Sequence, residues 1–441
     1  RTNFAGLIVG ACVDRTIITG FRTAAQGDDN GDEVAEALWD ENDMDVLSDE
    51  VHQDVFGYGR GYLLADPFSK RARRFRPWQA MSVPDTNGDP VIAVNFRHDP
   101  VSSRDIAQLW TREVDENGVG QGKVSCHFAV RDRKNKPTID GTFSTEVPLG
   151  TYISRNWKWW KTKVTTLDEI PLIEFQNRNE DGEFEKDTDV LDRINHMILQ
   201  RVVIITMQAF RQRAVQGNLP THDDKGKKIN YDELFPASPG ALWLLGPEAE
   251  MWESAPTSVQ DILGAVKDDV RDLAAVTRTP MTYFSPDSAN GSAEGATLQR
   301  EGYTSKINDR KARLSGRWRK FMSLMFTIMD TEETRKRAAI GEIEVLWTPT
   351  DVLSMTERYS AGTQAKGMGM SLATVMREVL HFTPKQMRAA ELERISESLK
   401  AALTPAGSAG AQQTPLNASR NAQNQLQSTN GATSRATGVS R

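Results

Sequence analysis

A polar loop followed by a long helical segment is predicted from residues 279–321, "TPMTYFSPDSANGSAEGATLQREGYTSKINDRKARLSGRWRKF". Pro280 stops the preceding helix, and the residues up to Gly291 are rich in Ser, Asp, Asn and Gly, which favour turns. Ser292 caps a helix that is predicted to reach about Met329. At 1.5 Å per residue, that helix is on the order of 50 Å long.

Two further helices are predicted before this stretch. One begins at Ser258, a suitable N-cap, and runs to about Val276. The other covers about 25 residues over 192–216 and is expected to end at Gly217. Its β-branched centre, "VVIITM", also suits a buried strand, but the length and polar flanks of the segment favour a helix. Between the two helices, turn formers and the short strands "ALWLL" and "EMWES" predict a small separate lobe.

The first 190 residues are predicted to be mixed α and β. Alternating apolar segments flank Asn87-Gly88 and Asn117-Gly118, the dipeptide best suited to tight hairpin turns. A strand, "EIEVLWTP", follows the long helix, and the clearest of the later helices begins at Pro384. From residue 404 onward the chain has almost no large apolar residues, so it cannot bury enough surface to order itself. The fold class is therefore predicted to be α+β.

Composition and charge exclude several classes of function. The 441 residues carry 60 acidic and 54 basic side chains, a net charge of −6, so there is no global basic footprint for nucleic acid. The most apolar run, residues 202–207, is far too short to cross a bilayer, so no membrane partner is predicted. Cys12 and Cys126 lie far apart and lack the spacing of metal ligands.

Motifs for cofactor chemistry are absent from the sequence. The chain has neither a phosphate-binding GxxxxGK[ST] loop nor a spaced dinucleotide fingerprint, and no cofactor, catalytic residue or metal site is predicted. Two acidic clusters, one of Asp187, Asp189 and Asp192 and one of Asp268, Asp269 and Asp272, suit either the metals of a nuclease or solvated helix faces. Solvated faces are the commoner meaning of such clusters.

Two segments, "KRARRFRPW" and "WKWWKTK", mix basic and aromatic residues in the way that nucleic-acid surfaces do. Tryptophan on a strand is more often a core residue, and we therefore expect these strands to contribute to the core.

The order of segments resembles the portal proteins of long-tailed bacteriophages. The stretch that carries most of the resemblance is "AAVTRTP", followed by "FSPDSANGSAEGA" and the long charged helix. Supporting stretches are "IPLIEFQNR", "ALWLLGPEAE", "EVLWTPTDVLSMTERYSAGTQAKGMG" and "VLHFTPKQMRAAELER". Together they cover about residues 1 to 400.

The resemblance implies a portal fold that assembles as a ring around a central channel, with wing, stem, clip and crown regions. In chain order the regions are 1–190 (wing), 191–216 (stem helix), 217–257 (clip), 258–280 (stem helix), 281–292 (tunnel loop), 293–354 (wing helix and strand), 355–403 (crown) and 404–441 (polar tail).

The resemblance also implies a function and its site residues. Portal rings, usually of twelve subunits, stand at one capsid vertex, and double-stranded DNA passes through them during packaging and ejection. The implied tunnel-loop residues are Tyr283, Phe284, Ser285, Pro286, Asp287, Ser288, Ala289, Asn290 and Gly291. The implied channel-lining residues of the second stem helix are Asp261, Lys267, Asp268, Arg271 and Asp272. The implied clip residues for partner docking are Trp243, Leu245, Glu248, Glu250 and Trp252.

Implied partners are further copies of the chain, the DNA, the large terminase subunit, a head-to-tail adaptor, and the major capsid and scaffolding proteins. The implied location is the virion, after assembly in the host cytoplasm. A channel must not hold DNA tightly, and a mainly acidic bore with few cations meets that need. Two alternatives stay open: a phage nuclease or head-maturation enzyme that uses an acidic cluster, and a monomeric capsid or tail adaptor.

Overall fold

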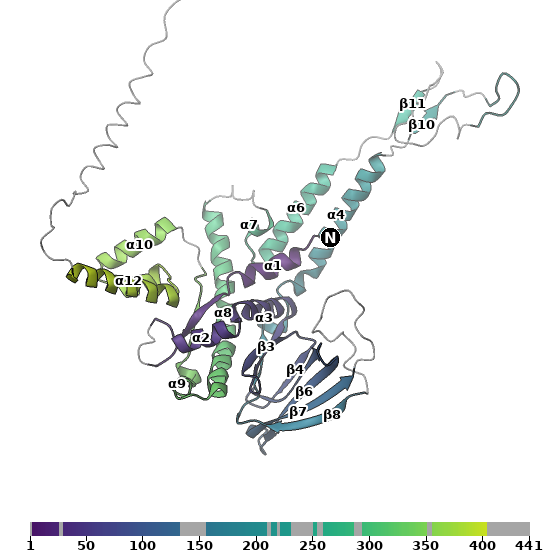
Figure 1. The fold of residues 1–441 in the computed structure, drawn as a ribbon. Helices are drawn as coiled ribbons and strands as arrows, with labels where there is room; N and C mark the ends of the chain where they lie inside the picture. Colours follow the sequence, from purple (N-terminus) through teal and green to yellow (C-terminus); the bar gives the residue numbers. More distant parts are fainter. Residues whose placement is uncertain are drawn as a thin grey trace, which may run out of the picture. The chain divides into compact units, whose positions relative to one another are not determined.

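The computed structural model describes residues 2–25, 30–132, 156–209, 213–217, 221–230, 250–253, 259–285, 293–350 and 355–403 (Figure 1). The chain divides into two compact units, residues 1–384 and 385–441. The described residues of the second unit belong to helix α12 (Pro384–Leu403). No helix in the described ranges is both long and apolar enough to span a membrane. Helices and strands occur together in the first unit, in agreement with the predicted α+β class.

A five-stranded antiparallel sheet in the order β4-β5-β6-β7-β8 forms one layer of the first unit. Its strands are β4 (Ala80–Pro84), β5 (Pro90–Asp99), β6 (Arg104–Val114), β7 (Gly120–Asp132) and β8 (Lys158–Val164). Both predicted hairpins are confirmed, since β4 pairs with β5 and β6 with β7. Gly88 and Gly118 have φ angles of 88° and 77° in the two turns, a region that glycine reaches without steric cost.

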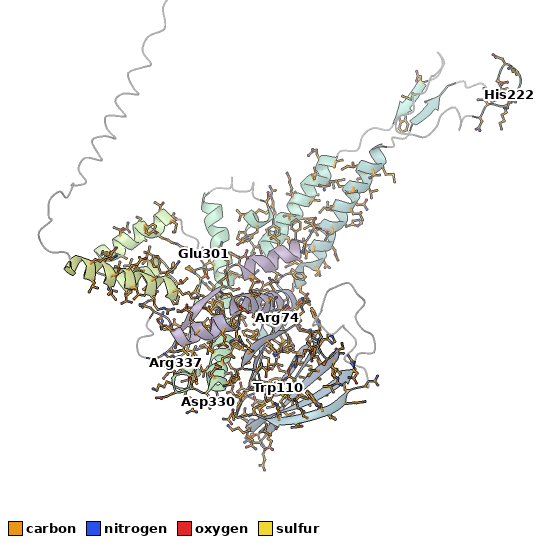
Figure 2. The ribbon with its side chains drawn as sticks, in the orientation of Figure 1. Arg74, Trp110, His222, Glu301, Asp330 and Arg337 are labelled. Atoms are coloured by element: carbon orange, nitrogen blue, oxygen red, sulfur yellow. The ribbon has the colours of Figure 1, made fainter. Side chains whose placement is uncertain are left out.

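A second, three-stranded sheet packs against this layer in the order β3-β2-β9. Its strands are β2 (Arg60–Asp66), β3 (Arg71–Phe75) and β9 (Leu172–Gln176). Side chains of both sheets form one apolar core around Trp110, which is fully buried and lies within the larger sheet (Figure 2). Its Nε1 donates a hydrogen bond to Asn95 Oδ1 at 2.8 Å, which satisfies the indole N–H inside the core.

The long helix α8 (Ala293–Met329) crosses the first unit as one element, as predicted. Around it lie α1 (Phe4–Val13), β1 (Ile18–Arg22), α2 (Glu33–Glu41), α3 (Met44–Tyr58) and β12 (Glu344–Trp347), and β1 pairs with β12. Trp318 of α8 is fully buried, with its ring centroid 4.8 Å from that of Phe175 and 5.5 Å from that of Trp39. The helix therefore joins the N-terminal helices to the smaller sheet.

Helices α4 (Thr188–Ala209) and α6 (Val259–Val276) form an antiparallel pair, which Figure 1 shows side by side. Strands β10 (Arg213–Gln216) and β11 (Glu250–Glu253) pair with each other in the segment between them. The prediction of a helix to residue 216 is thus wrong at its end, because residues 213–216 form a strand. Their backbone partners come from a strand more than 30 residues further along, and local periodicity does not reveal such a pairing.

The remaining elements are short. They are α7 (Met281–Phe284), α9 (Glu332–Arg335), α10 (Met355–Gly367), α11 (Leu372–Thr374), the π-helical turn η6 (Val375–Val379), and the 3₁₀ turns η2 (Arg178–Glu180), η3 (Glu185–Asp187) and η5 (Ile340–Glu342).

Candidate functional site

The antiparallel pair of α4 and α6, called the stem pair below, is held together by an apolar seam and one ion pair. Leu191 and Ile194 of α4 are buried against Val270 and Leu273 of α6. Nearby, Arg193 of α4 binds the Asp269 carboxylate through two nitrogens, with Nη2 to Oδ1 at 2.7 Å and Nε to Oδ2 at 3.0 Å. A bidentate guanidinium–carboxylate contact fixes the rotation of one helix against the other as well as their separation.

The face of α6 that points away from this seam carries the predicted channel residues. Asp261, Asp268, Arg271 and Asp272 are all exposed, and helical spacing places them opposite the buried Val270 and Leu273. Lys267 is also exposed but lies on the flank of the helix, and Arg271 Nη1 is 2.9 Å from Asp268 Oδ1. The exposed face thus has three carboxylates and two cations.

The predicted tunnel loop begins differently from expectation. Met281–Phe284 is a helical turn, α7, and Ser285 N donates to Met281 O at 3.0 Å, so residues 281–284 are not irregular loop. The Phe284 ring lies 5.5 Å from Phe4, and the Tyr283 ring lies 6.1 Å from Tyr303 of α8. Both rings are half-buried because they pack on these two aromatic side chains. Pro286, Asp287, Ser288, Ala289, Asn290 and Gly291 lie outside the described residues.

Of the predicted clip, residues 217–257, the structure describes residues 217, 221–230 and 250–253. Trp252 pairs with Ala214, and Glu250 pairs with Gln216, across the β10–β11 ladder. Trp252 is 55% exposed, and Glu250 is exposed as well. Trp243, Leu245 and Glu248 lie outside the described residues. Two of the five predicted docking residues are therefore surface residues on one small hairpin.

A buried ion cluster, which sequence reasoning missed, lies where the stem pair meets α8. Glu183, five residues before α4, has a side chain that is 3% exposed, and it accepts from Lys306 at 2.8 Å and from Arg310 at 2.6 Å. Lys306 Nζ also donates to the carbonyl of Thr277 at 2.8 Å, directly after α6 ends. One cluster therefore ties both stem helices to the long helix.

The electrostatics of this cluster favour its charged form. Burial by itself raises the pKa of the Glu183 carboxyl, but Lys306 and Arg310 outweigh burial and lower it below the ordinary value. The only signal in the sequence is that Lys306 and Arg310 stand four residues apart, on one face of α8. Nothing local connects them with Glu183, which is more than 120 residues away.

The acidic cluster of Asp268, Asp269 and Asp272 is divided between two sides of α6. Asp269 turns toward α4 and pairs with Arg193, whereas Asp268 pairs with Arg271 on the exposed face. Within the described ranges, no group of three or more His, Cys, Asp or Glu side chains is arranged to hold a metal ion.

The two basic-aromatic strands differ from each other. In β3, Arg71, Arg73 and Arg74 are all engaged in ion pairs with carboxylates of the same unit. In β8, by contrast, Trp159 is 71% exposed and Trp160 is 56% exposed. The expectation that these two tryptophans are core residues is wrong, because β8 is the last strand of its sheet among the described residues and both rings are largely exposed there.

The protein-family model described as "Phage portal protein, SPP1 Gp6-like" matches residues 1–403. The chain belongs to this family, which is a structural rather than an enzymatic kind of protein. A comparison with individual curated proteins gave no match.

Proposed function

We propose that copies of this chain close into a ring at one capsid vertex and that double-stranded DNA passes through the ring during packaging and ejection. The resemblance implies twelve copies. The membership of residues 1–403 in the phage portal family supports this role. The observation that carries the proposal is the contrast between the two exposed faces of the stem pair, one apolar and one polar.

The apolar face belongs to the second half of α4. Leu199, Val202, Val203 and Met207 follow a helical stripe, and their exposed fractions are 57%, 52%, 40% and 67%. Ile205, which is 52% exposed, lies on the side of the helix that carries Ile194. A contiguous group of large apolar side chains on a soluble surface is typical of a protein–protein interface. In the proposed ring, the stem pair of the next copy covers this stripe.

The polar face belongs to α6 and suits a bore that faces DNA. Every charge in a ring is repeated by symmetry, so Lys267 and Arg271 each become a belt of cations. A protein that makes six to ten phosphate contacts changes its affinity by about 10³–10⁵ over a modest salt range, and so strong an electrostatic hold would stop a moving duplex. Asp261, Asp268 and Asp272 offset those cations, and Arg271 is already paired with Asp268. The face therefore repels the duplex on balance and lets it slide.

The loop after α7 is proposed to narrow this channel. α7 is anchored by Phe284 against Phe4 and by Tyr283 against Tyr303, so the chain leaves toward residue 286 from a fixed point. We assign the contact with DNA to residues 285–291, and we assign to Tyr283 and Phe284 the anchoring of the loop.

The clip is proposed to dock the large terminase subunit during packaging and a head-to-tail adaptor afterwards. Exposed Trp252 and Glu250 on β11 are candidates for this contact, since aromatic residues are enriched among the side chains that dominate binding energy. Major capsid and scaffolding proteins are proposed to contact other surfaces of the ring. The ring is proposed to assemble in the host cytoplasm and to remain in the virion.

The assembly is tested by placing a charge in the apolar stripe. Val203→Asp puts a carboxylate into an interface from which water is excluded, so we expect the ring to dissociate. Gln53→Asp, at an exposed polar position of α3 outside the stem pair, is the control and should assemble normally. Native mass spectrometry reads out both variants. Wild-type protein that stays a monomer would overturn the ring and favour the adaptor alternative.

The enzyme alternative has its own test. Metal-dependent cleavage of DNA or of a head protein by purified wild-type protein, abolished by Asp268→Ala, would favour a nuclease or maturation enzyme. We expect no cleavage by either protein, because Asp268 is paired with Arg271 and Asp269 with Arg193.

A further inference from the structure

Strand β8 closes one side of the five-stranded sheet and leaves a row of backbone groups open. It pairs with β7 on one side only, and within the described residues no strand pairs along its other edge. All seven of its residues are exposed. Such an edge is a template for another extended segment, and proteins usually protect it with a short strand, charge or cover.

At the other end of the sheet, the edge is protected. β4 ends in Pro84, which has no N–H to donate, and Ser82 of β4 donates a hydrogen bond to Glu174 of β9. β8 has neither feature, since it contains no proline and no hydrogen bond ties its side chains to the smaller sheet in the described ranges.

A β-bulge in β8 gathers its three lysines on one face. Lys163 pairs with Cys126, Lys161 with Phe128 and Lys158 with Val130, with a register shift between residues 128 and 129 of β7. In a regular strand, Lys158 and Lys161 would lie on opposite faces because they are three residues apart. Trp160 is the extra residue of the bulge, and its insertion places Lys158 on the same face as Lys161. The three cations therefore form a row along the rim of the inner face.

These lysines have no carboxylate partner within the described residues. Lys161 Nζ lies 3.7 Å from the Trp160 ring centroid, and Lys163 Nζ lies 4.7 Å from that of Phe68, so both rest on aromatic rings. The nearby Asp168 is already paired with Lys123 at 2.8 Å. Cations in a row select a partner by charge and also prevent β8 of one copy from pairing with β8 of another.

The opposite face of β8 carries two large apolar side chains, with Thr162 between them. Trp159 pairs with Ala129 and Val164 with Ser125, so both side chains stand on the face away from the lysines. They are 71% and 68% exposed. Lysines on an edge strand by themselves discourage the addition of another strand. Exposed tryptophan on the same strand has the opposite meaning, because exposed apolar area is typical of a surface that a partner covers.

We propose that β8 is a docking edge for an extended acidic segment of a partner protein, which adds to the sheet as a sixth strand. Carboxylates at every second position of that segment face Lys158, Lys161 and Lys163, and the apolar side chains between them cover Trp159 and Val164. Strand addition supplies affinity through backbone hydrogen bonds, and the alternating side chains supply specificity. The inference does not depend on the ring, since β8 lies outside the stem pair.

The probe is a capped, fluorescently labelled peptide that alternates Glu and Val over eight residues, measured by fluorescence anisotropy against the full chain. We expect saturable binding that weakens with salt. Lys161→Glu with Lys163→Glu should weaken it on the order of tenfold or more, since two charge contacts are lost and the reversed charges repel the peptide. Lys336→Glu, at an exposed site on another element, is the matched control and should bind like wild type.

Three further arms identify the mode of binding. A peptide with Lys in place of Glu should bind the doubly reversed variant better than wild type. A peptide with proline at alternate positions cannot donate to the edge and should not bind. Trp159→Ala should weaken binding of the original peptide without changing its dependence on salt.

Each contrary result overturns the proposal. Equal binding of the original peptide to wild type and to the doubly reversed variant removes the role of the lysines, and equal binding of the proline peptide removes strand addition. Failure of every acidic peptide, together with lysine-dependent binding of an oligonucleotide, assigns the edge to nucleic acid. Circular dichroism of each variant checks that the sheet is intact.

Discussion

Replacement of Glu183 by Gln is the sharpest test of the joint between the stem pair and α8. The substitution keeps the shape of the side chain and removes its charge. Lys306, whose side chain is 6% exposed, then loses its carboxylate partner, whereas Arg310, 12% exposed, keeps its contact with Asp309. Removal of one partner from a buried pair costs about 3–5 kcal/mol, because the remaining charge has lost both water and its counterion. Since domains are stable by about 5–15 kcal/mol, a loss of this size is large.

The control for this prediction is an ion pair on the surface. Glu332 and Lys336 are 3.1 Å apart with side chains 85% and 68% exposed, so Glu332→Gln should change the free energy of unfolding by less than about 1 kcal/mol. Both variants are unfolded in urea at one fixed protein concentration, because self-association adds to the measured stability. A change for Glu183→Gln as small as that for Glu332→Gln would refute the reasoning.

The pH dependence gives an independent check of the same cluster. The pKa of Glu183 is lower in the folded protein than its ordinary value of 4.5, so its contribution is complete above that value and is lost as pH falls through the folded pKa. The difference between wild type and Glu183→Gln should therefore be greatest near pH 7 and shrink below about pH 4.5. A difference that stays constant down to pH 3 would mean that the charge is not its source.

Three other predictions concern separate parts of the chain. Burial lowers the pKa of His52 to about 3, so its imidazole stays neutral in the folded protein while it becomes protonated in the unfolded chain. Urea unfolding of the wild type should therefore show a free energy of unfolding that falls by about 1.4 kcal/mol between pH 7.5 and 5.5 because of this group. His52→Gln should abolish that fall. Gly59→Ala should destabilise the protein by more than about 2 kcal/mol, because residue 59 has a φ of 78° and the added Cβ would collide with the Glu180 carbonyl. Gly57→Ala is the control, since its added Cβ would meet no other atom, and it should be neutral or stabilising in thermal unfolding. Asp272→Lys should raise the affinity of assembled particles for duplex DNA in filter binding and steepen its salt dependence, and an unchanged affinity would count against α6 facing the bore.

Much of the fold was predictable where the signal is local. Asn87-Gly88 and Asn117-Gly118 identified both hairpins because each turn requires a positive φ angle at its glycine, which few other residues tolerate. Helix α8 was predicted over its whole length because helix formers run without interruption by proline from residue 293 to 329. Resemblance to portal proteins, drawn from the order of these segments, is confirmed by the family match.

The errors arise where distant segments decide the outcome. Residues 213–216 form a strand because β11 pairs with them, and Trp159 is exposed because, within the described residues, β8 has a neighbouring strand on one side only. Tyr283 and Phe284 pack as a helical turn because Tyr303 and Phe4 lie within reach. The Glu183 cluster joins residues more than 120 positions apart, and no spacing rule connects them.

The central claim is that α6 lines a shared pore, and an electron-microscopy reconstruction of purified wild-type particles tests it most directly. The account predicts a closed ring in which Asp261, Asp268 and Asp272 face the central axis and the apolar stripe of α4 contacts the next copy. Particles that remain single, or a ring whose outer wall carries those three aspartates, would contradict it.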